Sequence, residues 1–496
     1  MTEENKSTGL RGMLLRLSAY YRNANAALKA SLWFAFCSFV QKGISVLTMP
    51  IFTRLMSTEQ YGQYNVFLSW YNILVILVSL NIHSEIFNKG LIEHAEEQDA
   101  YTASQAGLLI ALSAFWIALY LPLRNFFNAF LGLTTVLVLF MFFEILGSSL
   151  VGLWTARKRF SFEYQKIVRL TLSMAILNPL VGMAAVLLTE HKAEARIISN
   201  AVIPIAAALG LLIVIARKGS LFQNRVWWKP ALLAALPLIP HYLSLVLLNQ
   251  SDKLMIDHFS GAADAAIYSV AHSAGLLLTI VNTSINHSFV PWSYDKLKNH
   301  QGAGIRRISS MLLLLVALIN VLLIWLAPEA VHLLAAPQYG EAIWCLVPIA
   351  MSVFFFFAYT LFVDVEIYYG GNRYIAVASV LAAALNVALN AVFIPGFGYV
   401  AAGYTTLFSY AATMLLHLLF LKLLLKERGA VSRLFDLRML AAVSLLLAAL
   451  SAVGMLLYGH PILRLGIVAA ACAAAVFRRR ALIHIFSELK NRGAES

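Results

Sequence analysis

The chain has 496 residues, of which 60% are hydrophobic and 12% are charged. A soluble domain has about 45–50% apolar and about 25% charged residues, so the composition excludes a large soluble enzyme, a disordered chain and a collagen-like chain. The three cysteines lie in separate apolar stretches without a CxxC spacing, which argues against a disulfide scaffold and a zinc site. The composition is that of a protein that crosses a membrane many times.

The balance of charge is basic, with 37 Lys and Arg against 24 Asp and Glu and a formal net charge of +13. Nucleic-acid-binding proteins carry such an excess, but so do membrane proteins whose cytoplasmic loops collect basic residues. The apolar composition favours the second explanation, and we expect no nucleic-acid partner. The first 29 residues are polar and basic, and the apolar stretch after them is too long for a cleavable signal peptide.

Fourteen apolar stretches of about 20 residues predict fourteen transmembrane helices, because open strands cannot span lipid. In chain order they cover residues 28–52, 64–88, 101–121, 130–154, 166–188, 196–216, 231–257, 264–290, 308–327, 341–369, 374–394, 399–421, 438–458 and 462–477. The predicted fold class is therefore all-α integral membrane. A stripe of apolar residues over 10–22, with arginines largely off it, suits either a helix lying on the cytoplasmic leaflet or a solvated basic tail.

The distribution of Lys and Arg predicts the orientation of these helices. If the N-terminus is cytoplasmic, 30 of the 37 basic residues fall in cytoplasmic segments. Two lie within spans, and the outer loops hold five: Arg54, Arg124, Lys192, Arg196 and Arg464. This asymmetry supports an even number of spans with both termini in the cytoplasm.

The two halves of the chain show an internal similarity. Leu55–Val66, between the first two spans, and Phe259–Val270, between spans 7 and 8, both lead from an apolar residue through a polar or small-residue loop to Tyr-x-Val, 204 residues apart. Chance similarity in an Ala- and Leu-rich sequence is the alternative. Six spans per half predict two lobes related by an axis along the membrane normal, followed by an appended helix pair. The expected divisions are 1–27 for the basic tail, 28–218 and 219–425 for the lobes, and 426–496 for the last pair and tail.

Several short motifs resemble one family. They are Met49–Met56, Tyr61–Tyr64, Asp252–Ile256, Ile267–Val270 and Phe289–Tyr294. They look like the corresponding segments of the polysaccharide-transporter (Wzx-type flippase) family of the multidrug/oligosaccharidyl-lipid/polysaccharide (MOP) exporter superfamily. The resemblance covers the first twelve spans in length and order, and fourteen spans are usual for this branch.

The resemblance implies two six-helix lobes around a central cavity that opens alternately to either side of a bacterial inner membrane. It implies as substrate an oligosaccharide carried on undecaprenyl pyrophosphate, for O-antigen, exopolysaccharide or capsule synthesis. The implied partners are membrane lipid, H⁺ or Na⁺ as counter-ion, and the polysaccharide polymerase with its chain-length machinery. A transporter of this kind is not an enzyme and needs no cofactor.

Ionisable side chains inside spans are the candidate functional residues, because lipid rejects them. Lys42 and Lys253 are candidate cations for a pyrophosphate, and Lys253 has as alternatives a pair with Asp257 or an outward-reaching orientation. The candidate cavity residues are Lys42, Lys253, Asp252, Tyr242 and Arg54.

The acids inside or near spans are candidates for ion coupling or gating. They are Glu144, Glu85, Asp364, Glu366 and Asp257. A buried carboxylate without a partner is a plausible proton carrier, and structural pairing with Arg157, Arg159 or Arg373 is the alternative. No metal site is expected, because no histidine has metal-ligand spacing to a second ligand.

No nucleotide-binding loop or hydrolase motif occurs, so transport must be passive or driven by an ion gradient or the membrane potential. Two functions compete with the flippase. A cation-coupled multidrug antiporter of the same superfamily predicts essential acids and a dispensable Lys42. A membrane polysaccharide polymerase or ligase usually has a long outer loop, which this sequence lacks.

Overall fold

The computed structural model describes residues 26–426 and 430–477, and every regular element in these residues is a helix. The predicted all-α membrane class is confirmed. The basic N-terminal tail with its apolar stripe over 10–22, and the C-terminal tail from residue 478, lie outside the described residues.

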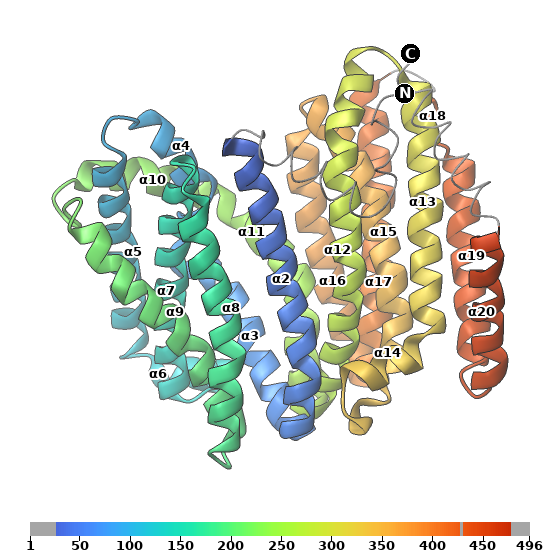
Figure 1. Cartoon of the computed structure of the whole chain (residues 1–496), viewed down its shortest axis with the longest axis horizontal. Helices are drawn as coiled ribbons and strands as arrows, with labels where there is room; N and C mark the ends of the chain where they lie inside the picture. The colour runs from blue at the N-terminus through green and yellow to red at the C-terminus, as the bar shows by residue number, and fades with distance from the viewer. Residues whose placement is uncertain (1–25, 427–429, 478–496) are drawn as a thin grey trace, which may run out of the picture. The chain divides into compact units, whose positions relative to one another are not determined.

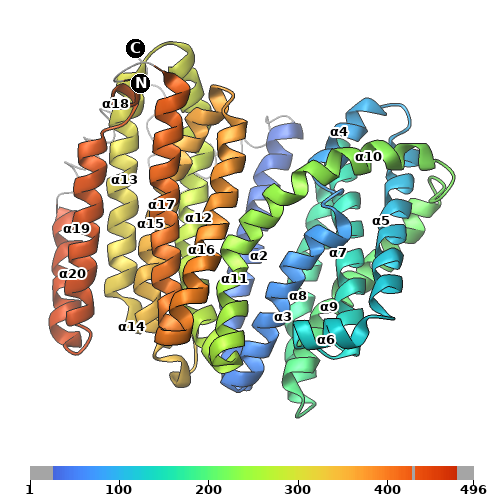
Figure 2. The ribbon, with the colours of Figure 1, turned by 180° about the vertical axis from the view of Figure 1, so that it is seen from behind.

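The described residues form two compact units. The first unit comprises residues 26–48 and 74–239, and the second comprises residues 49–73, 240–426 and 430–477. The helices from the N-terminus to the end of the first unit are α2 (Ala26–Leu55), α3 (Thr58–Ser79), α4 (Glu85–Glu93), α5 (Gln98–Tyr120), α6 (Arg124–Leu131), α7 (Thr135–Phe160), α8 (Tyr164–Leu187), α9 (Lys192–Ala216) and α10 (Trp228–Ala235). Within the first unit, α4 and α10 lie at one end and α6 at the other (Figures 1 and 2).

The second unit continues with a longer series of helices. They are α11 (Ile239–Ser260), α12 (Ala262–Lys298), α13 (Gly302–Trp325), α14 (Ala327–Leu334), α15 (Ala342–Tyr368), α16 (Asn372–Phe397), α17 (Tyr399–Leu425), α18 (Ala430–Leu434), α19 (Leu437–Leu456) and α20 (Pro461–Phe477). Gly261, with φ of 93°, adopts the left-handed conformation that lets α12 start directly after α11. In both views α19 and α20 lie beside each other at the margin of this unit, next to α13.

The division between the units differs from the predicted lobe boundary at residues 218–219. The first unit extends to Ile239, because α10 packs against α5, where the indole Nε1 of Trp228 donates to the backbone oxygen of Ser104 at 3.0 Å. Residues 49–73 group with the second unit, where the Ser69 hydroxyl donates to Oε1 of Gln250 at 3.1 Å.

Twelve helical segments among the described residues are long and apolar enough to cross a membrane. The other two predicted spans coincide with α3 and with the shorter α20, so the count of fourteen is not confirmed. The second span was expected at 64–88, but α3 ends at Ser79 and the chain turns through Leu80 and Asn81, both at positive φ. Polar residues at this turn, Asn81, His83 and Ser84, end the span early and separate it from α4.

Helix boundaries support the predicted duplication. Helices α5 and α13 begin at residues 98 and 302, 204 apart, the same spacing as Tyr64 and Tyr268. The short helices α6 and α14 occupy the same place in each half, before α7 and α15. The halves differ at α3 and α4, which are separate, whereas the corresponding α12 is one continuous helix of 37 residues.

Two basic residues expected in outer loops are buried inside helices instead. Arg196 lies in α9 and Arg464 in α20, with 6% and 1% of their surfaces exposed. Arg464 donates to the backbone oxygen of Trp325 and to Oε1 of Glu329, both at 2.6 Å. The position of Arg464 near the start of an apolar stretch suggested a loop residue, but in the structure its hydrogen bonds join α20 to the end of α13 and to α14.

Replacing Arg464 with Met is expected to lower the stability of the purified protein by about 1.5–3 kcal/mol, because two hydrogen bonds from a charged donor are lost in a buried site. The shift of the thermal-unfolding midpoint in detergent measures this change. Arg438→Met, at an exposed position on α19, is the matched control and should unfold as the wild type does. Equal stability of the two variants would contradict the anchoring role.

Candidate functional site

A buried carboxylate organises the polar interior of the second unit. Asp252 of α11 is 2% exposed and accepts three hydrogen bonds from three other helices. The donors are Tyr268 of α12 at 2.5 Å, Asn390 of α16 at 2.6 Å and Thr406 of α17 at 2.7 Å. One side chain therefore joins the four helices α11, α12, α16 and α17.

A second layer of amides and hydroxyls completes this Asp252 cluster, which we define as Ser251, Asp252, Tyr268, Asn386, Asn390, Thr405 and Thr406. Oδ1 of Asn386 accepts from Ser251 at 3.0 Å and from Nδ2 of Asn390 at 3.2 Å. The Thr405 hydroxyl donates to Oδ1 of Asn390. All seven residues are buried. The cluster is rich in oxygen atoms, the ligand type that hard cations prefer.

The Asp252 carboxylate forms no ion pair within the described part of the chain, although the neighbouring Lys253 interacts with it electrostatically. No salt bridge there involves its carboxylate, and the nearby Nζ of Lys253 instead lies 3.5 Å from Oε1 of Gln250. An ionised carboxylate held only by neutral donors in a buried site is costly, and a proton or a bound cation removes that cost. A small pocket of about 70 Å³ adjoins Asp252, His272, Thr406 and Tyr410.

The first unit has a comparable network with a different charge balance. Glu144 of α7 is 3% exposed and accepts from Nδ2 of Asn200 at 2.6 Å. Asn200 in turn accepts from Asn178 at 3.1 Å, and Asn178 accepts from NH2 of Arg196 at 3.1 Å. This Glu144 network contains its own cation, since Arg196 also interacts electrostatically with Glu144. An acid with a built-in counter-charge is suited to holding helices together.

A second pair of titratable groups lies elsewhere in the second unit. Oε2 of Glu366 on α15 is 2.8 Å from Nδ1 of His417 on α17, and both residues are fully or almost fully buried. The ring of Tyr359 stacks on His417 with centroids 5.3 Å apart. Asp364 is buried near the same end of α15. The partner of Glu366 is thus a histidine, not the arginine that the sequence suggested.

The predicted cationic residues are accessible to different degrees. Lys42 is exposed on α2 in the first unit, and Lys253 is half-buried on α11 in the second. Arg54 is exposed and donates to the backbone oxygen of Pro50 at 2.9 Å. Tyr242 is half-buried beside His241, with ring centroids 5.9 Å apart.

Two expectations about acids need correction. Glu85 was placed inside the second span, but it is exposed in the first turn of the short helix α4, because α3 ends at Ser79. An ion pair between Lys253 and Asp257 is not among the salt bridges of the described residues, and Asp257 is half-buried.

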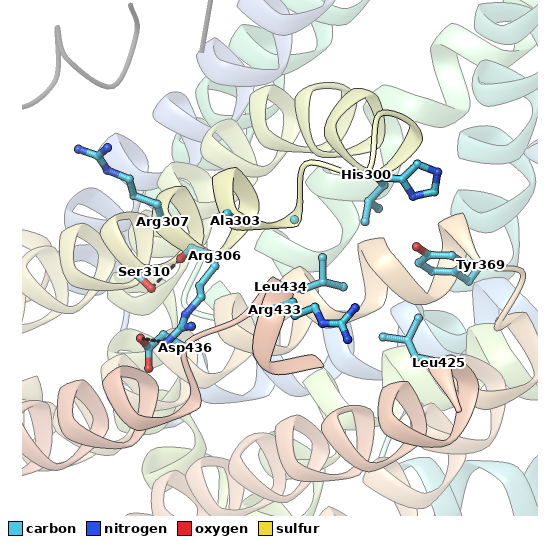
Figure 3. Close-up of a pocket in the computed structure, with 12 residues that line it drawn as sticks. His300, Ala303, Arg306, Arg307, Ser310, Tyr369, Leu425, Arg433, Leu434 and Asp436 are labelled. Atoms are coloured by element: carbon cyan, nitrogen blue, oxygen red, sulfur yellow. Dashed lines mark hydrogen bonds and ion pairs between the residues drawn. The ribbon is translucent and has the colours of Figure 1, made fainter. Parts of the chain in front are cut away.

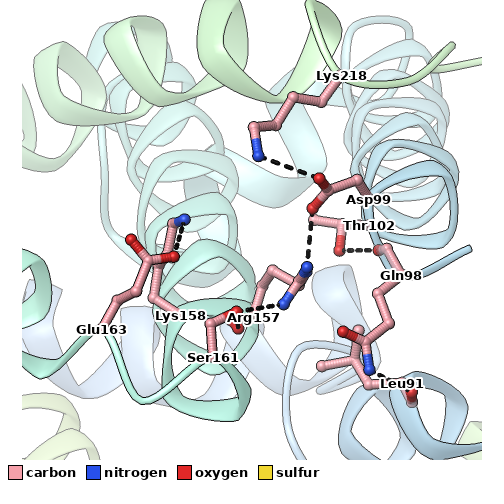
Figure 4. Close-up of polar contacts among 9 residues, drawn as sticks. All are labelled: Leu91, Gln98, Asp99, Thr102, Arg157, Lys158, Ser161, Glu163 and Lys218. Atoms are coloured by element: carbon pink, nitrogen blue, oxygen red, sulfur yellow. Dashed lines mark hydrogen bonds and ion pairs between the residues drawn. The ribbon is translucent and has the colours of Figure 1, made fainter. Parts of the chain in front are cut away.

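The basic residues of the α7–α8 turn form ion pairs at the end of the first unit (Figure 4). Asp99 of α5 accepts from Nε of Arg157 and from Nζ of Lys218, each at 3.0 Å. Nζ of Lys158 lies 2.5 Å from Glu163, and hydrogen bonds from Lys158 and Lys166 lower the pKa of Glu163 to about 2. These groups clamp α5, α7 and α9 together and do not pair with the acids of the spans.

Sequence analysis missed most partners of Asp252. Two signals were available: Asn386 and Asn390 lie one helical turn apart in an otherwise apolar span, and Thr405, Thr406, Ser409 and Thr413 follow helical spacing on α17. Such patterns predict a polar stripe on each helix. They do not predict that both stripes face Asp252, since the rotation of each helix about its axis is set by packing.

Comparison with known proteins places these features in a family context. Residues 27–295, more than half of the chain, match a family described as "Polysaccharide biosynthesis protein". The chain is 28% identical over 156 residues to "Lsg locus putative protein 1" of Haemophilus influenzae, covering 31% of this chain and 39% of that relative. The chain therefore aligns with about two fifths of the relative's length.

Solved structures share the fold at low sequence identity. The inward closed conformation of the lipid II flippase MurJ matches with a TM-score of 0.62 and 13% identity, over 91% of this chain and all of that one. An inward-facing multidrug resistance MATE family transporter of the MOP superfamily matches with a TM-score of 0.55 and 12% identity, over 78% and 96% of the two chains. The Vibrio cholerae MATE transporter VcmN gives 0.51 and 15%, over 81% and 95%.

Proposed function

Because this multi-pass membrane protein belongs to the polysaccharide biosynthesis protein family and has the fold of MOP transporters, we propose that it is a flippase for lipid-linked oligosaccharides. Its substrate is an oligosaccharide repeat unit on undecaprenyl pyrophosphate. The protein moves it from the inner to the outer leaflet of a bacterial cytoplasmic membrane, for O-antigen, exopolysaccharide or capsule synthesis. Both termini lie in the cytoplasm, and the polymerase with its chain-length machinery receives the product.

The Asp252 cluster carries the proposal for how transport is driven. In the first unit the hydrogen-bond network of Glu144 includes the cation Arg196, whereas Asp252 is hydrogen-bonded only to neutral donors and has Lys253 as an electrostatic neighbour. A proton or Na⁺ that binds at Asp252 changes the net charge of the cluster and thereby the packing of the four helices it joins. The two lobes then exchange between inward-open and outward-open states, with the bound cation as the coupling ion.

Lys42 and Lys253 are proposed to bind the substrate rather than the coupling ion. A pyrophosphate entering a low-dielectric cavity needs positive charge, and an ammonium group supplies it as a point charge. Lys42 is exposed on a span, where a lipid-facing lysine costs about 2.5–3.5 kcal/mol, so an aqueous cavity is its favourable surrounding. Lys253, half-buried beside Asp252, links the substrate cavity to the ion site.

Replacing Lys42 with Ala is expected to reduce export of the lipid-linked oligosaccharide about tenfold, because a charge-assisted contact to the diphosphate is lost. The measurement is surface polysaccharide, together with inner-leaflet undecaprenyl-linked oligosaccharide, in a deletion strain complemented with each variant at matched expression. Lys89→Ala, at an exposed position on α4, is the control. Lys42→Arg should retain most export. Undiminished export by Lys42→Ala would remove this lysine from the mechanism.

The same strain distinguishes the competing functions. A multidrug antiporter with this fold would confer drug resistance, would need Asp252 and would tolerate Lys42→Ala. Deletion of a polymerase would leave single lipid-linked repeat units on the outer leaflet, and deletion of a ligase would leave lipid-linked polymer there. Deletion of a flippase leaves single repeat units on the inner leaflet. Accumulation on the inner leaflet supports the flippase, and either other pattern overturns it.

A further inference from the structure

Helix α2 carries a row of polar side chains within its membrane-crossing part. Phe36–Leu55 is one of the segments of the described residues that are long and apolar enough to cross a membrane. Within it Ser38, Gln41, Lys42 and Ser45 are all exposed. Counted from the first of them, they are spaced by three, four and seven residues, which puts them on one face of the helix. We call these four residues the α2 polar stripe.

The side of α2 away from this stripe is apolar and is exposed as well. Phe36, Phe39 and Leu47 have 49%, 66% and 73% of their surfaces exposed. Lipid is a favourable surrounding for these side chains, but it rejects an amide and an ammonium group. Helix α2 therefore has one face suited to lipid and another suited to water.

The fold does not require the central pair of the stripe to be polar. In the internal similarity of the two halves, equivalent residues are 204 apart. The residues of α11 that correspond to Gln41 and Lys42 are Leu245 and Val246. A helix at the same place in the repeat thus forms with apolar residues at both positions. This difference favours a role for Gln41 and Lys42 in what the helix contacts.

The cation of the stripe differs from basic residues at the ends of helices. Those form ion pairs, as Arg306 does with Asp436 at 2.6 Å (Figure 3) and Arg157 does with Asp99 at 3.0 Å (Figure 4). No ion pair among the described residues involves Lys42. The stripe therefore presents an ammonium group with an amide beside it and a hydroxyl about one turn away in each direction.

This set of groups matches a phosphate that carries a sugar. An ammonium group binds phosphate as a point charge, and an amide both donates and accepts, as the neighbouring hydroxyl groups of a sugar require. Ser38 and Ser45 are about 10 Å apart along the helix axis. The stripe is thus long enough to contact a diphosphate and a sugar next to it.

We propose that the α2 polar stripe recognises the sugar that is linked to the diphosphate. Lys42 contacts the diphosphate, and Gln41, flanked by Ser38 and Ser45, hydrogen-bonds the hydroxyl groups of the first sugar. This inference rests on the proposed flippase function and adds Gln41 as a specificity-determining residue. A site built to hydrogen-bond a hydroxyl group discriminates strongly against a ligand that lacks it.

Cysteine labelling of the full chain in membrane vesicles tests the position of the stripe. In a background whose three native cysteines are replaced by Ala, Gln41→Cys should react with a membrane-impermeant maleimide about tenfold faster than Leu47→Cys, because a thiol in apolar surroundings is rarely ionised. The reagent is applied to both sides of the membrane. Lipid-linked oligosaccharide extracted from the deletion strain should slow the reaction of Gln41→Cys, and undecaprenyl pyrophosphate without sugar should not.

Binding to the purified protein tests the role of the amide with the native cysteines in place. Gln41→Leu keeps the size of the side chain and removes its hydrogen-bonding groups, so it should weaken binding of the sugar-bearing lipid about threefold to tenfold. Its affinity for undecaprenyl pyrophosphate should not change, whereas Lys42→Ala should weaken binding of both lipids. Thr48→Val is the matched control, because the Thr48 hydroxyl donates within the helix to the backbone oxygen of Ser45 at 3.1 Å.

The outcomes separate this inference from the proposed function. Equal labelling of Gln41→Cys and Leu47→Cys overturns the inference, and so does wild-type affinity of Gln41→Leu for the sugar-bearing lipid. Equal protection by undecaprenyl pyrophosphate assigns the stripe to the diphosphate alone and also overturns it. In each of these cases the wild type still binds the lipid-linked oligosaccharide. A wild type that binds neither lipid overturns the flippase proposal and this inference together.

Discussion

Asp252→Asn is expected to abolish cation-driven transport while the protein remains folded. Asn has nearly the same shape as Asp, and its oxygen still accepts from the hydroxyls of Tyr268 and Thr406, but it has no charge to attract a cation or proton. Loss of a buried charged contact worth about 1.5–3 kcal/mol lowers cation affinity by about tenfold to a hundredfold. Transport in proteoliposomes under an imposed Na⁺ or proton gradient measures the loss.

The choice of cation follows from a second measurement on the same variant. If Na⁺ is the coupling ion, NaCl raises the thermal-unfolding midpoint of the wild type relative to choline chloride, and Asp252→Asn removes this effect. If the proton is the coupling ion, sodium has no effect and the transport rate of the wild type depends on pH, whereas the variant is insensitive to pH.

Asp264→Asn is the matched control, since Asp264 lies in the first turn of the next helix, α12, is half-buried and is outside the cluster. It should transport under both gradients as the wild type does. Gradient-dependent transport by Asp252→Asn at the wild-type rate would show that the Asp252 cluster is structural. The coupling ion would then have to bind at another acid. The Glu366–His417 pair is the next candidate, because it too is buried and titratable.

The positions of the helices could be predicted from sequence because the membrane imposes a length. About 20 apolar residues are needed per span, and every predicted stretch coincides with a helix in the described residues. The predicted boundaries are wrong where polar residues or a proline interrupt an apolar stretch. Asn81, His83 and Ser84 end the second span early, and Pro237 accompanies a short 3₁₀ turn, Leu236–Leu238, between α10 and α11.

The polar sites could be predicted only in part. Glu144 and Asp252 were identified as charges inside spans, but their partners are distant in sequence. Asn200 lies 56 residues after Glu144, and Asn390 lies 138 residues after Asp252. Hydrophobic periodicity does not predict which faces of two distant helices meet. Arg196 was expected in an outer loop for a related reason. In sequence, an arginine near the end of a span can lie in a loop or be buried beside an acid, and only the fold shows that Arg196 is near Glu144.

Arg196→Met is expected to destabilise the first unit by about 1.5–3 kcal/mol, because the buried hydrogen bond from its guanidinium to Asn178 is lost and Glu144 loses an electrostatic partner. Glu144→Gln is expected to cost less, since Gln still accepts from Asn200. The double variant should be more stable than the sum of the single changes predicts, because two unpaired charges are removed together. Thermal unfolding of the four proteins in detergent gives this coupling energy.

These four proteins, together with Asp252→Asn, separate a structural acid from a coupling acid. Glu144→Gln with Arg196→Met should retain dependence on the cation gradient, whereas Asp252→Asn should lose it at little cost in stability. The physical basis is the hydrogen bonding of each network: the network of Glu144 contains the cation Arg196, whereas every hydrogen-bond donor to Asp252 is neutral. Additive destabilisation in the double variant, or loss of gradient dependence there, would contradict this division of roles between the two units.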